Sequence, residues 1–282
     1  MMARADEVSS IPRRDIKFDL DDCDMNHWHK SGRHVSQFLN ALSLVFPEGE
    51  KFFIDSVRFY RDDITDSNLV QDVKGFIGQE AMHSREHIAY NRALERCGLP
   101  ANELERSFKK QLRLLRKWLP ARIQLAITTA AEHFTALMAD MTLGDERTLA
   151  SKEERLSSLW RWHAIEETEH KAVAFDVYST MFGRGPTAYF VRVCTMVFVT
   201  FYFLCLITYN HFRLCKAAGI LFDFRGWVSY FSFEFVSPGP LRKMLPQYLS
   251  YFRPRFHPWD RDNRYQVQRW RTEYTATGEP PS

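Results

Sequence analysis

The motif Glu-x-x-His occurs twice in this sequence, in GQEAMHSREHIAYNRAL (residues 78–94) and in WHAIEETEHKAVAFDVY (residues 162–178). The two pairs are Glu80 with His83 and Glu167 with His170. Side chains three positions apart lie on one face of a helix, one turn from each other. A carboxylate and an imidazole presented together make half of a two-metal site. The sequence therefore predicts two helices that share a metal centre.

Both pairs continue an apolar stripe of their helix, which predicts that they face the core. The first stripe runs through Val73, Phe76, Ile77, Glu80, His83, His87, Asn91 and Leu94. The second runs through Leu159, His163, Glu166, Glu167, His170, Val173, Ala174 and Val177. Burial of a carboxylate without a partner costs several kcal/mol. A solvated or hydrogen-bonded pair would explain one motif alone, but two on core stripes favour a bound cation.

Two further glutamates complete the expected set of carboxylates. Glu50 precedes Phe53, Ile54 and Val57 at helical spacing, although a first-turn Glu is also stabilised by the helix dipole. Glu132 lies on a stripe of small and apolar residues that leaves room for a metal cluster or a substrate. The neighbouring His133 points about 100° away by helix geometry, so we expect it to support a ligand and not to bind metal.

The order of these segments predicts an all-α, ferritin-like four-helix bundle with additional C-terminal helices. Period-two alternation is almost absent, and helices are expected over about 34–46, 47–61, 69–97, 120–144 and 151–182. A basic amphipathic stretch over 101–118 suits a crossover between the two halves of the bundle. We expect an N-terminal arm at 1–33, the metal-binding bundle at 34–182, and at 183–282 an apolar helix and a tail rich in Pro and aromatic residues, packed on the bundle.

An apolar segment at 187–209 could be a packed helix, an interfacial anchor or a membrane-spanning helix. The 17 residues from Val193 to Tyr209 carry no formal charge, which is at the lower edge of a spanning helix. A long packed helix is favoured, and an interfacial anchor or a membrane span remains open. The tail motif His257-Pro258-Trp259-Asp260 is interpreted as a surface loop, with closure over the end of the bundle as the alternative.

The composition limits which kinds of partner and which cellular compartment we expect for this protein. A net charge of +3 over 282 residues does not point to a nucleic-acid partner. The five cysteines are dispersed without Cys-x-x-Cys, which favours reduced thiols over disulfides or a zinc site. The N-terminus shows no apolar signal-peptide core. We therefore expect a cytoplasmic protein, with membrane association through 187–209 left open.

The motifs also carry two family resemblances. The segments FPEGEKFF, IGQEAMHSREHIAYNRAL, AAEHFTALMAD, WHAIEETEHKAVAFDVY and the FHPWD tail resemble a bacterial family of predicted metal-dependent hydrolases, over about residues 28–265. The pattern His163-x-x-x-Glu167-x-x-His170 resembles the last helix of di-iron arylamine N-oxygenases. That second resemblance implies the ligand set Glu50, Glu80, His83, Glu132, His163, Glu167 and His170. His87, one turn beyond His83, departs from it and is either an eighth ligand or a supporting group.

The expected function follows from such a centre. Two metal ions are expected, with iron favoured over manganese and zinc, and Glu166, Asp140 and Asp176 are candidates to orient ligand imidazoles. The leading hypothesis is a di-iron, O2-activating oxygenase or oxidase that acts on an apolar or aromatic small molecule and needs an electron donor. The alternatives are a binuclear metal-dependent hydrolase and a metal-binding or membrane-associated protein without turnover. A peripheral membrane contact is kept open.

Overall fold

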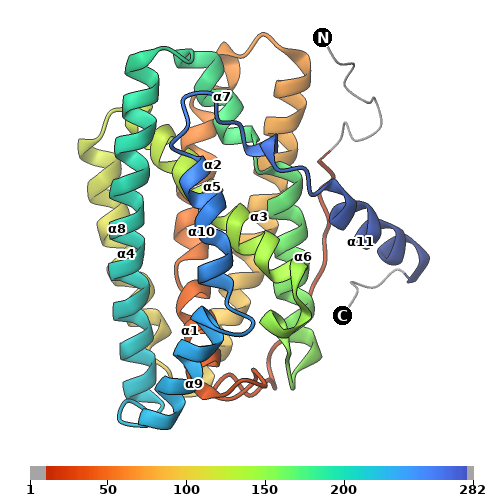
Figure 1. The fold of residues 1–282 in the computed structure, drawn as a ribbon, viewed down its shortest axis with the longest axis vertical. Helices are drawn as coiled ribbons and strands as arrows, with labels where there is room; N and C mark the ends of the chain where they lie inside the picture. Colours follow the sequence, from red (N-terminus) through yellow and green to blue (C-terminus); the bar gives the residue numbers. More distant parts are fainter. Residues whose placement is uncertain (1–10, 278–282) are drawn as a thin grey trace.

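Helices account for all the regular secondary structure in the computed structural model, which describes residues 11–277 (Figure 1). The predicted all-α class is therefore confirmed for this part of the chain. Three short 3-10 turns lie between the helices, at Arg61–Asp63, Glu146–Leu149 and Pro258–Asp260. Residues 1–10, which include part of the predicted arm and of the N-terminal segment without a signal-peptide core, lie outside the described residues.

Two antiparallel helix pairs form the centre of the molecule. Helix α2 (Phe46–Arg58) packs on α3 (Ser67–Arg96), and α5 (Ala121–Gly144) packs on α6 (Glu154–His170). Helix α4 (Ala101–Trp118) links the two pairs, as its amphipathic pattern predicted. Helix α1 (Arg33–Ser43) precedes α2 and contacts α3. This arrangement confirms a helical bundle whose long helices carry the two Glu-x-x-His motifs.

The fourth bundle helix is shorter than the sequence predicted. Instead of one helix over 151–182, α6 ends at His170 and α7 begins only at Val173 (Val173–Phe182). Between them lies Lys171, a buried lysine whose Nζ donates to the Arg261 carbonyl at 2.8 Å and to Asn263 Oδ1 at 2.7 Å. These hydrogen bonds connect the interruption to the C-terminal tail, a long-range contact that no local sequence pattern could show.

The N-terminal arm is extended and partly buried. Along residues 13–20 exposed and buried side chains alternate, and Arg14, Ile16, Phe18 and Leu20 point inward. The backbone N–H of Phe18 donates to Glu86 Oε2 at 3.2 Å, which holds the arm against α3. This short period-two pattern was overlooked at the sequence level because the arm pairs with no strand. It brings a charged residue, Arg14, into the interior.

Helix α8 (Pro186–Ala217) lies lengthwise against α5 and α1, at the left of the bundle in Figure 1. By length and composition it is the one helix in residues 11–277 that could cross a membrane, and 33% of its most apolar window is buried. Its outer face leaves Phe190, Phe198 and Phe201 at 67%, 44% and 71% exposure. The favoured expectation of a packed helix is thus met on one face only.

The remaining helices cover the lower and front parts of the bundle. Helix α9 (Phe224–Phe235) contacts α1, α10 (Pro240–Ser250) runs along α5, and α11 (Arg264–Thr277) extends outward beside α6 (Figure 1). The tail motif also folds back onto the protein, since His257 Nε2 lies 3.0 Å from Asp176 Oδ1 on α7. The motif nevertheless stays at the surface, since none of the residues Pro258–Asp260 is buried.

Candidate metal centre

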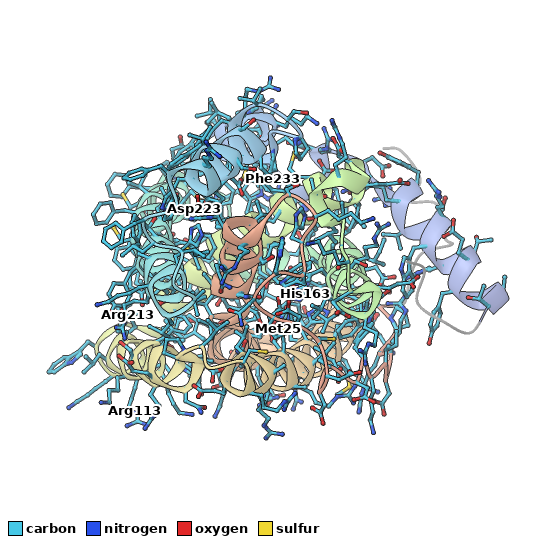
Figure 2. All side chains as sticks on the ribbon, turned by 90° about the horizontal axis from the view of Figure 1, so that it is seen from below. Met25, Arg113, His163, Arg213, Asp223 and Phe233 are labelled. Carbon is cyan, nitrogen blue, oxygen red and sulfur yellow. The ribbon has the colours of Figure 1, made fainter. Side chains whose placement is uncertain are left out.

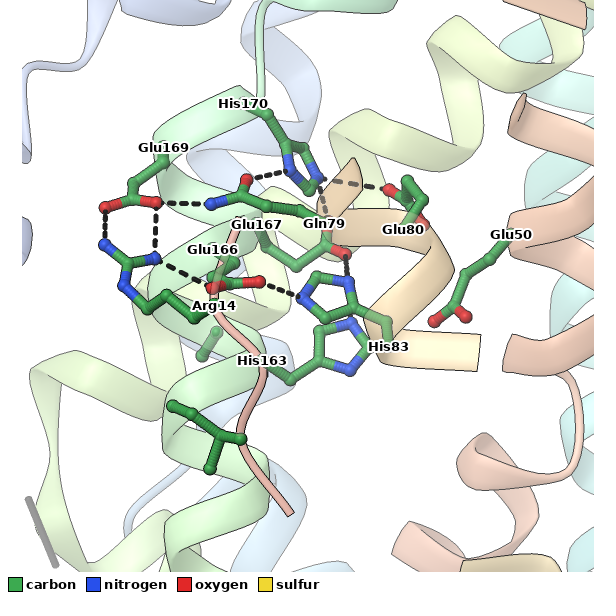
Figure 3. A network of polar contacts seen from close by, with 12 residues as sticks. Arg14, Glu50, Gln79, Glu80, His83, His163, Glu166, Glu167, Glu169 and His170 are labelled. Carbon is green, nitrogen blue, oxygen red and sulfur yellow. Dashed lines mark hydrogen bonds and ion pairs between the residues drawn. The ribbon is translucent and has the colours of Figure 1, made fainter. Parts of the chain in front are cut away.

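Seven of the eight predicted ligands meet in the interior of the bundle. Each of the central helices contributes: α2 carries Glu50, α3 carries Glu80 and His83, and α6 carries His163, Glu167 and His170 (Figure 3). Helix α5 adds Glu132. None of the seven is more than 3% exposed. Seen along the bundle, His163 lies well inside the ring of helices (Figure 2).

These seven side chains form two adjacent groups. One group contains Glu80, Glu132, Glu167 and His170, and the other contains Glu50, His83 and His163. Within each group one donor atom per residue lies within 4.8 Å of the others, a spacing at which the donors could hold one metal ion.

Glu167 connects the two groups. Its Oε1 lies 2.9 Å from His163 Nε2, and its Oε2 lies 3.5 Å from His170 Nε2. His83 Nδ1 also lies 3.7 Å from Glu167 Oε1. A carboxylate placed between two sets of donors can bridge two metal ions, so the arrangement suits a dinuclear centre better than two separate sites.

The electrostatics of the centre call for a cation. Both carboxylate oxygens of Glu80 and Glu132, and one of Glu50, are buried without a hydrogen-bond partner. Burial and the neighbouring carboxylates raise the pKa of all three groups well above the ordinary value. His170 is the main positive partner inside the cage, because Glu167 raises the pKa of this imidazole to about 9 against the effect of burial. Metal ions would compensate the remaining charge.

Gln79 orients the ring of His170. The amide Oε1 of Gln79 lies 2.9 Å from His170 Nδ1, and its Nε2 donates to Glu169 Oε2 at 2.6 Å and to the Pro12 carbonyl at 3.0 Å. Because the amide oxygen is an acceptor, Nδ1 of His170 must carry the proton. Nε2 faces Glu80 and Glu167 and carries the second proton of the charged ring, and loss of that proton would free its lone pair for a metal ion.

Arg14 and Glu166 perform the same task for His83. Glu166 Oε2 lies 3.0 Å from His83 Nε2, and its Oε1 accepts a hydrogen bond from Arg14 at 2.8 Å. Arg14 also binds both oxygens of Glu169, at 2.7 and 2.9 Å (Figure 3). Glu166 faces Nε2 at ion-pair distance without a hydrogen bond, and His83 has Nδ1 on the side of Glu167, 3.7 Å from its Oε1. Glu166 thus takes the orienting position that the sequence suggested for it.

A hydrogen-bonded relay places His87 behind His163. Ser43 Oγ donates to Asn91 Oδ1 at 2.8 Å and so accepts from His87 Nδ1 at 2.9 Å. His87 Nε2 is then an acceptor for Nδ1–H of His163, at 2.7 Å. On its other side, His163 Nε2 donates to Glu167 Oε1 at 2.9 Å, and a metal ion bound at this nitrogen would replace that proton. Of the two roles left open for His87, this geometry fits the supporting group.

Three other expectations for the surroundings of the centre were wrong. His133 does not support a ligand: its ring packs on Tyr251 and Phe256, with centroids 4.9 and 5.1 Å apart. Asp140 pairs with Arg261 at 2.8 Å, and Asp176 pairs with His257. Both aspartates anchor the C-terminal tail, because that tail, which sequence spacing could not place, covers their side of the bundle.

Two apolar cavities of about 90 Å³ each meet the centre from different sides. The first lies under α9 and α10 and reaches His163 and Glu167. The second lies between α2, α4, α5 and α8 and reaches Glu50. Phe46, Thr135 and Met138 line both. Three candidate ligands, His163, Glu167 and Glu50, therefore border largely apolar space that a molecule could occupy.

Comparison with known proteins agrees with a metal-dependent role. A family profile described as predicted metal-dependent hydrolase matches residues 12–262. The chain belongs to this family. No curated protein and no solved structure matches it. In this chain the matched region spans the extended arm from Pro12, the whole cage and the tail up to Asp262.

Sequence reasoning missed several groups that support this hydrolase-family site. Arg14, Gln79, Glu169 and Ser43 each contact a candidate ligand or its partner. A signal existed for Arg14, since the alternation of Arg14, Ile16, Phe18 and Leu20 marks one buried face. No comparable signal exists for Gln79 or Ser43, whose roles depend on the helices that they face.

Replacing His87 with alanine should weaken metal binding without removing a ligand. We expect metal affinity to fall about 10–100-fold while two ions still bind at saturation, because only the orientation of His163 is lost. Titration of the metal-free protein with Fe(II) or Zn(II), followed by metal analysis, measures both quantities. His133→Ala is the control for loss of a buried imidazole. A drop in stoichiometry in the His87 variant alone would instead make His87 a ligand.

Proposed function

We propose that the protein is a dinuclear metalloenzyme that acts on an apolar or aromatic small molecule. One observation carries the proposal: a buried cage of four glutamates and three histidines adjoins two apolar cavities. An unpaired set of buried acids has little structural use, whereas such donors suit Fe(II), Mn(II) or Zn(II). The four-helix origin of the ligands also supports the ferritin-like interpretation.

The residues of the cage take distinct roles in this proposal. Glu167 would bridge the metals, and so would Glu80, whose charge acts on Glu50 of the other group. Glu50 and Glu132 would bind from the two sides. His83, His163 and His170 would bind through the nitrogens that their partners leave free. Arg14, Gln79 and His87 keep those rings oriented. The apolar walls of the cavities exclude water and hold the substrate against the His163–Glu167 side.

The finer proposal is a di-iron oxygenase or oxidase. Two iron ions held by nitrogen and oxygen ligands would supply O2 activation and would need an external electron donor. The apolar cavities support this choice, since they suit a substrate without hydrolysable polar groups. The two buried cations near the cage already have other partners. Arg14 pairs with Glu166 and Glu169, and Lys171 binds the tail, so neither compensates the charge of the cage.

A binuclear hydrolase is the second candidate, and the family description favours it. In that case the metals would be redox-inert and would activate water for attack on an ester, amide or phosphoester. The same four carboxylates and three imidazoles would bind the metals. The two candidates therefore differ in the metal and in the need for O2, not in the residues of the cage.

Metal exchange separates the two candidates. The protein is prepared free of metal under anaerobic conditions and loaded with Fe(II) or with Zn(II). We expect the Fe(II) form to consume O2 and to change its optical spectrum on exposure to air, and the Zn(II) form to be inactive. Hydrolysis of a panel of aryl esters and amides by the Zn(II) form, without O2 or reductant, would reject the oxygenase and support the hydrolase. If the protein binds neither Fe(II) nor Zn(II), both the oxygenase and the hydrolase are rejected.

A further inference from the structure

Glu234 is a buried acid that the metal centre does not use. It lies on the inner side of α9, is 1% exposed and lines the first cavity. Its Oε1 has no hydrogen-bond partner, and within residues 11–277 no ion pair involves it. Other buried acids outside the cage have cationic partners: Glu166 and Glu169 bind Arg14, and Asp140 binds Arg261.

The cavity links Glu234 to the metal centre. Its walls are mostly apolar side chains from α1, α5, α6 and α10, among them Phe38, Leu42 and Met244. His163 and Glu167 border the same space. A molecule in this cavity can therefore meet the carboxyl group of Glu234 and the ligands of the cage.

We propose that Glu234 binds the hydrogen-bond-donating end of an elongated apolar substrate, an alcohol or an amine and not a carboxylate. The proposal rests on the proposed function, because it takes the cavity as the substrate site of the metal centre. It adds the chemical class of the substrate: an apolar body with an O–H or N–H head. The second cavity, which shares Phe46, Thr135 and Met138 with the first, offers space for a longer body beyond the cage.

Physical chemistry favours a donor over an acid as the ligand group. A buried carboxyl group without a partner is costly, and an O–H or N–H from a ligand removes that cost. An ammonium head would form a buried ion pair, and a hydroxyl head would exchange hydrogen bonds with either form of the acid. A carboxylate head would meet a like charge or compete for one proton. Burial raises the pKa of Glu234 to about 8, which agrees with an acid that lacks a partner until a ligand arrives.

Direct binding of octyl probes tests the assignment on the full-length protein. Octan-1-ol, octylamine and octanoate share one apolar body, and calorimetry measures their affinities at pH 9, above the pKa of Glu234, where this acid is ionised. We expect the alcohol or the amine to bind at least about 10-fold more tightly than octanoate, since a good hydrogen bond to a charged group is worth this much. The tighter of the two identifies the head. Absence of binding by all three probes would overturn the proposal.

Glu234→Gln provides the decisive comparison, because an amide can donate to a carboxylate. This variant should bind octylamine more weakly and octanoate more tightly than the wild type, each by about 10-fold or more. Glu234→Leu should lose the discrimination between heads, and Glu154→Gln, at an exposed acid of α6, should change nothing. An unchanged ranking in folded Glu234→Gln would overturn the proposal. These affinities do not require turnover, so their outcome is separate from that of the metal-exchange experiment.

The outer side of α9 supports a second, independent inference. Phe224, Val228, Phe231 and Phe235 form one stripe at spacings of four, three and four, and each is at least 50% exposed. Around the stripe lie the exposed cations Lys216, Arg225 and Arg242, and Asp223 is the only exposed acid over residues 213–250. An amphipathic helix with an aromatic face and basic flanks is typical of attachment to an anionic bilayer surface.

We infer that α9 docks onto an anionic lipid surface. Flotation with phosphatidylcholine vesicles, with and without phosphatidylglycerol, tests this. The protein should float with the anionic vesicles, less so in high salt, and Phe231→Ser with Phe235→Ser should abolish flotation. Phe59→Ser, at an exposed aromatic after α2, is the control. No flotation of the wild type would overturn the inference. A change from dimer to monomer in the stripe variant without lipid would assign the stripe to a second copy instead.

Discussion

Metal loading should raise the thermal stability of this protein by a large margin. The metal-free cage holds four buried glutamates around the charged imidazole of His170, with several carboxylate oxygens lacking a hydrogen bond, and each bound ion removes part of that cost. At a thousand-fold excess over Kd, binding stabilises the fold by about 4 kcal/mol for each site. For two ions in a chain of this size we expect the Tm to rise by roughly 15 °C or more. Calorimetry with and without Fe(II) or Zn(II) measures the shift.

The size of this shift should increase with pH. In the metal-free fold the pKa values of Glu50, Glu80 and Glu132 are raised, and that of His170 is raised to about 9. The native state thus holds more protons than the unfolded state, and its stability is lost as pH rises through these raised values. Below about pH 6.5 the buried imidazoles of His83 and His87, whose pKa values are lowered by burial, oppose this trend.

The informative window is therefore pH 6.5 to 9. Across it the metal-free protein should lose stability, whereas the metal-loaded protein, whose ligands are already deprotonated, should not. Unfolding is followed at both ends of the window for the two forms. A metal-induced shift that is absent, or that shrinks as pH rises, would contradict a metal centre built from these carboxylates.

Replacement of Glu167 by alanine should have the largest effect on metal binding. Glu167 lies between the two donor groups, 2.9 Å from His163 Nε2 and 3.5 Å from His170 Nε2. Without it we expect no more than one ion per chain, and a loss of affinity greater than the roughly 10–100-fold expected for a supporting residue. Metal analysis after equilibrium dialysis measures the stoichiometry.

Glu154→Ala is the matched control for this variant. It removes a glutamate from the same helix, but from an exposed position in the first turn. It should keep two ions with unchanged affinity. Two ions retained by the Glu167 variant would show that the groups bind metal separately and would reject a bridging role for this carboxylate.

The sequence was most informative where the spacing of residues along the chain directly sets the geometry of the site. Glu80, His83, Glu167 and His170 could be recognised because spacing i, i+3 places two side chains on one helix face and because apolar neighbours continue that face. The same reasoning predicted the buried positions of Glu50, Glu132 and His163. It also predicted the bundle, since helix periodicity and capping act over a few residues.

The roles of neighbouring polar residues depended on what faces them across the bundle. His87 and His163 have equivalent positions on their stripes, yet the Ser43–Asn91 relay places one behind the other. Asp140 and Asp176 lie on ligand-bearing or adjacent helices, but the returning tail occupies them. Arg14 reaches the centre from an arm more than 150 residues away in sequence from Glu166.

Thus the sequence by itself determined the helical class, the bundle and the residues of the candidate cage. These features follow from helix periodicity and from the cost of burying charge, both of which can be read from neighbouring residues. Only the tertiary structure decided the orientation of each imidazole, the break after His170, the half-exposed face of α8 and the cavity that joins Glu234 to the cage. Each of these depends on contacts between segments distant along the chain, whose relative placement is decided by packing of the whole molecule.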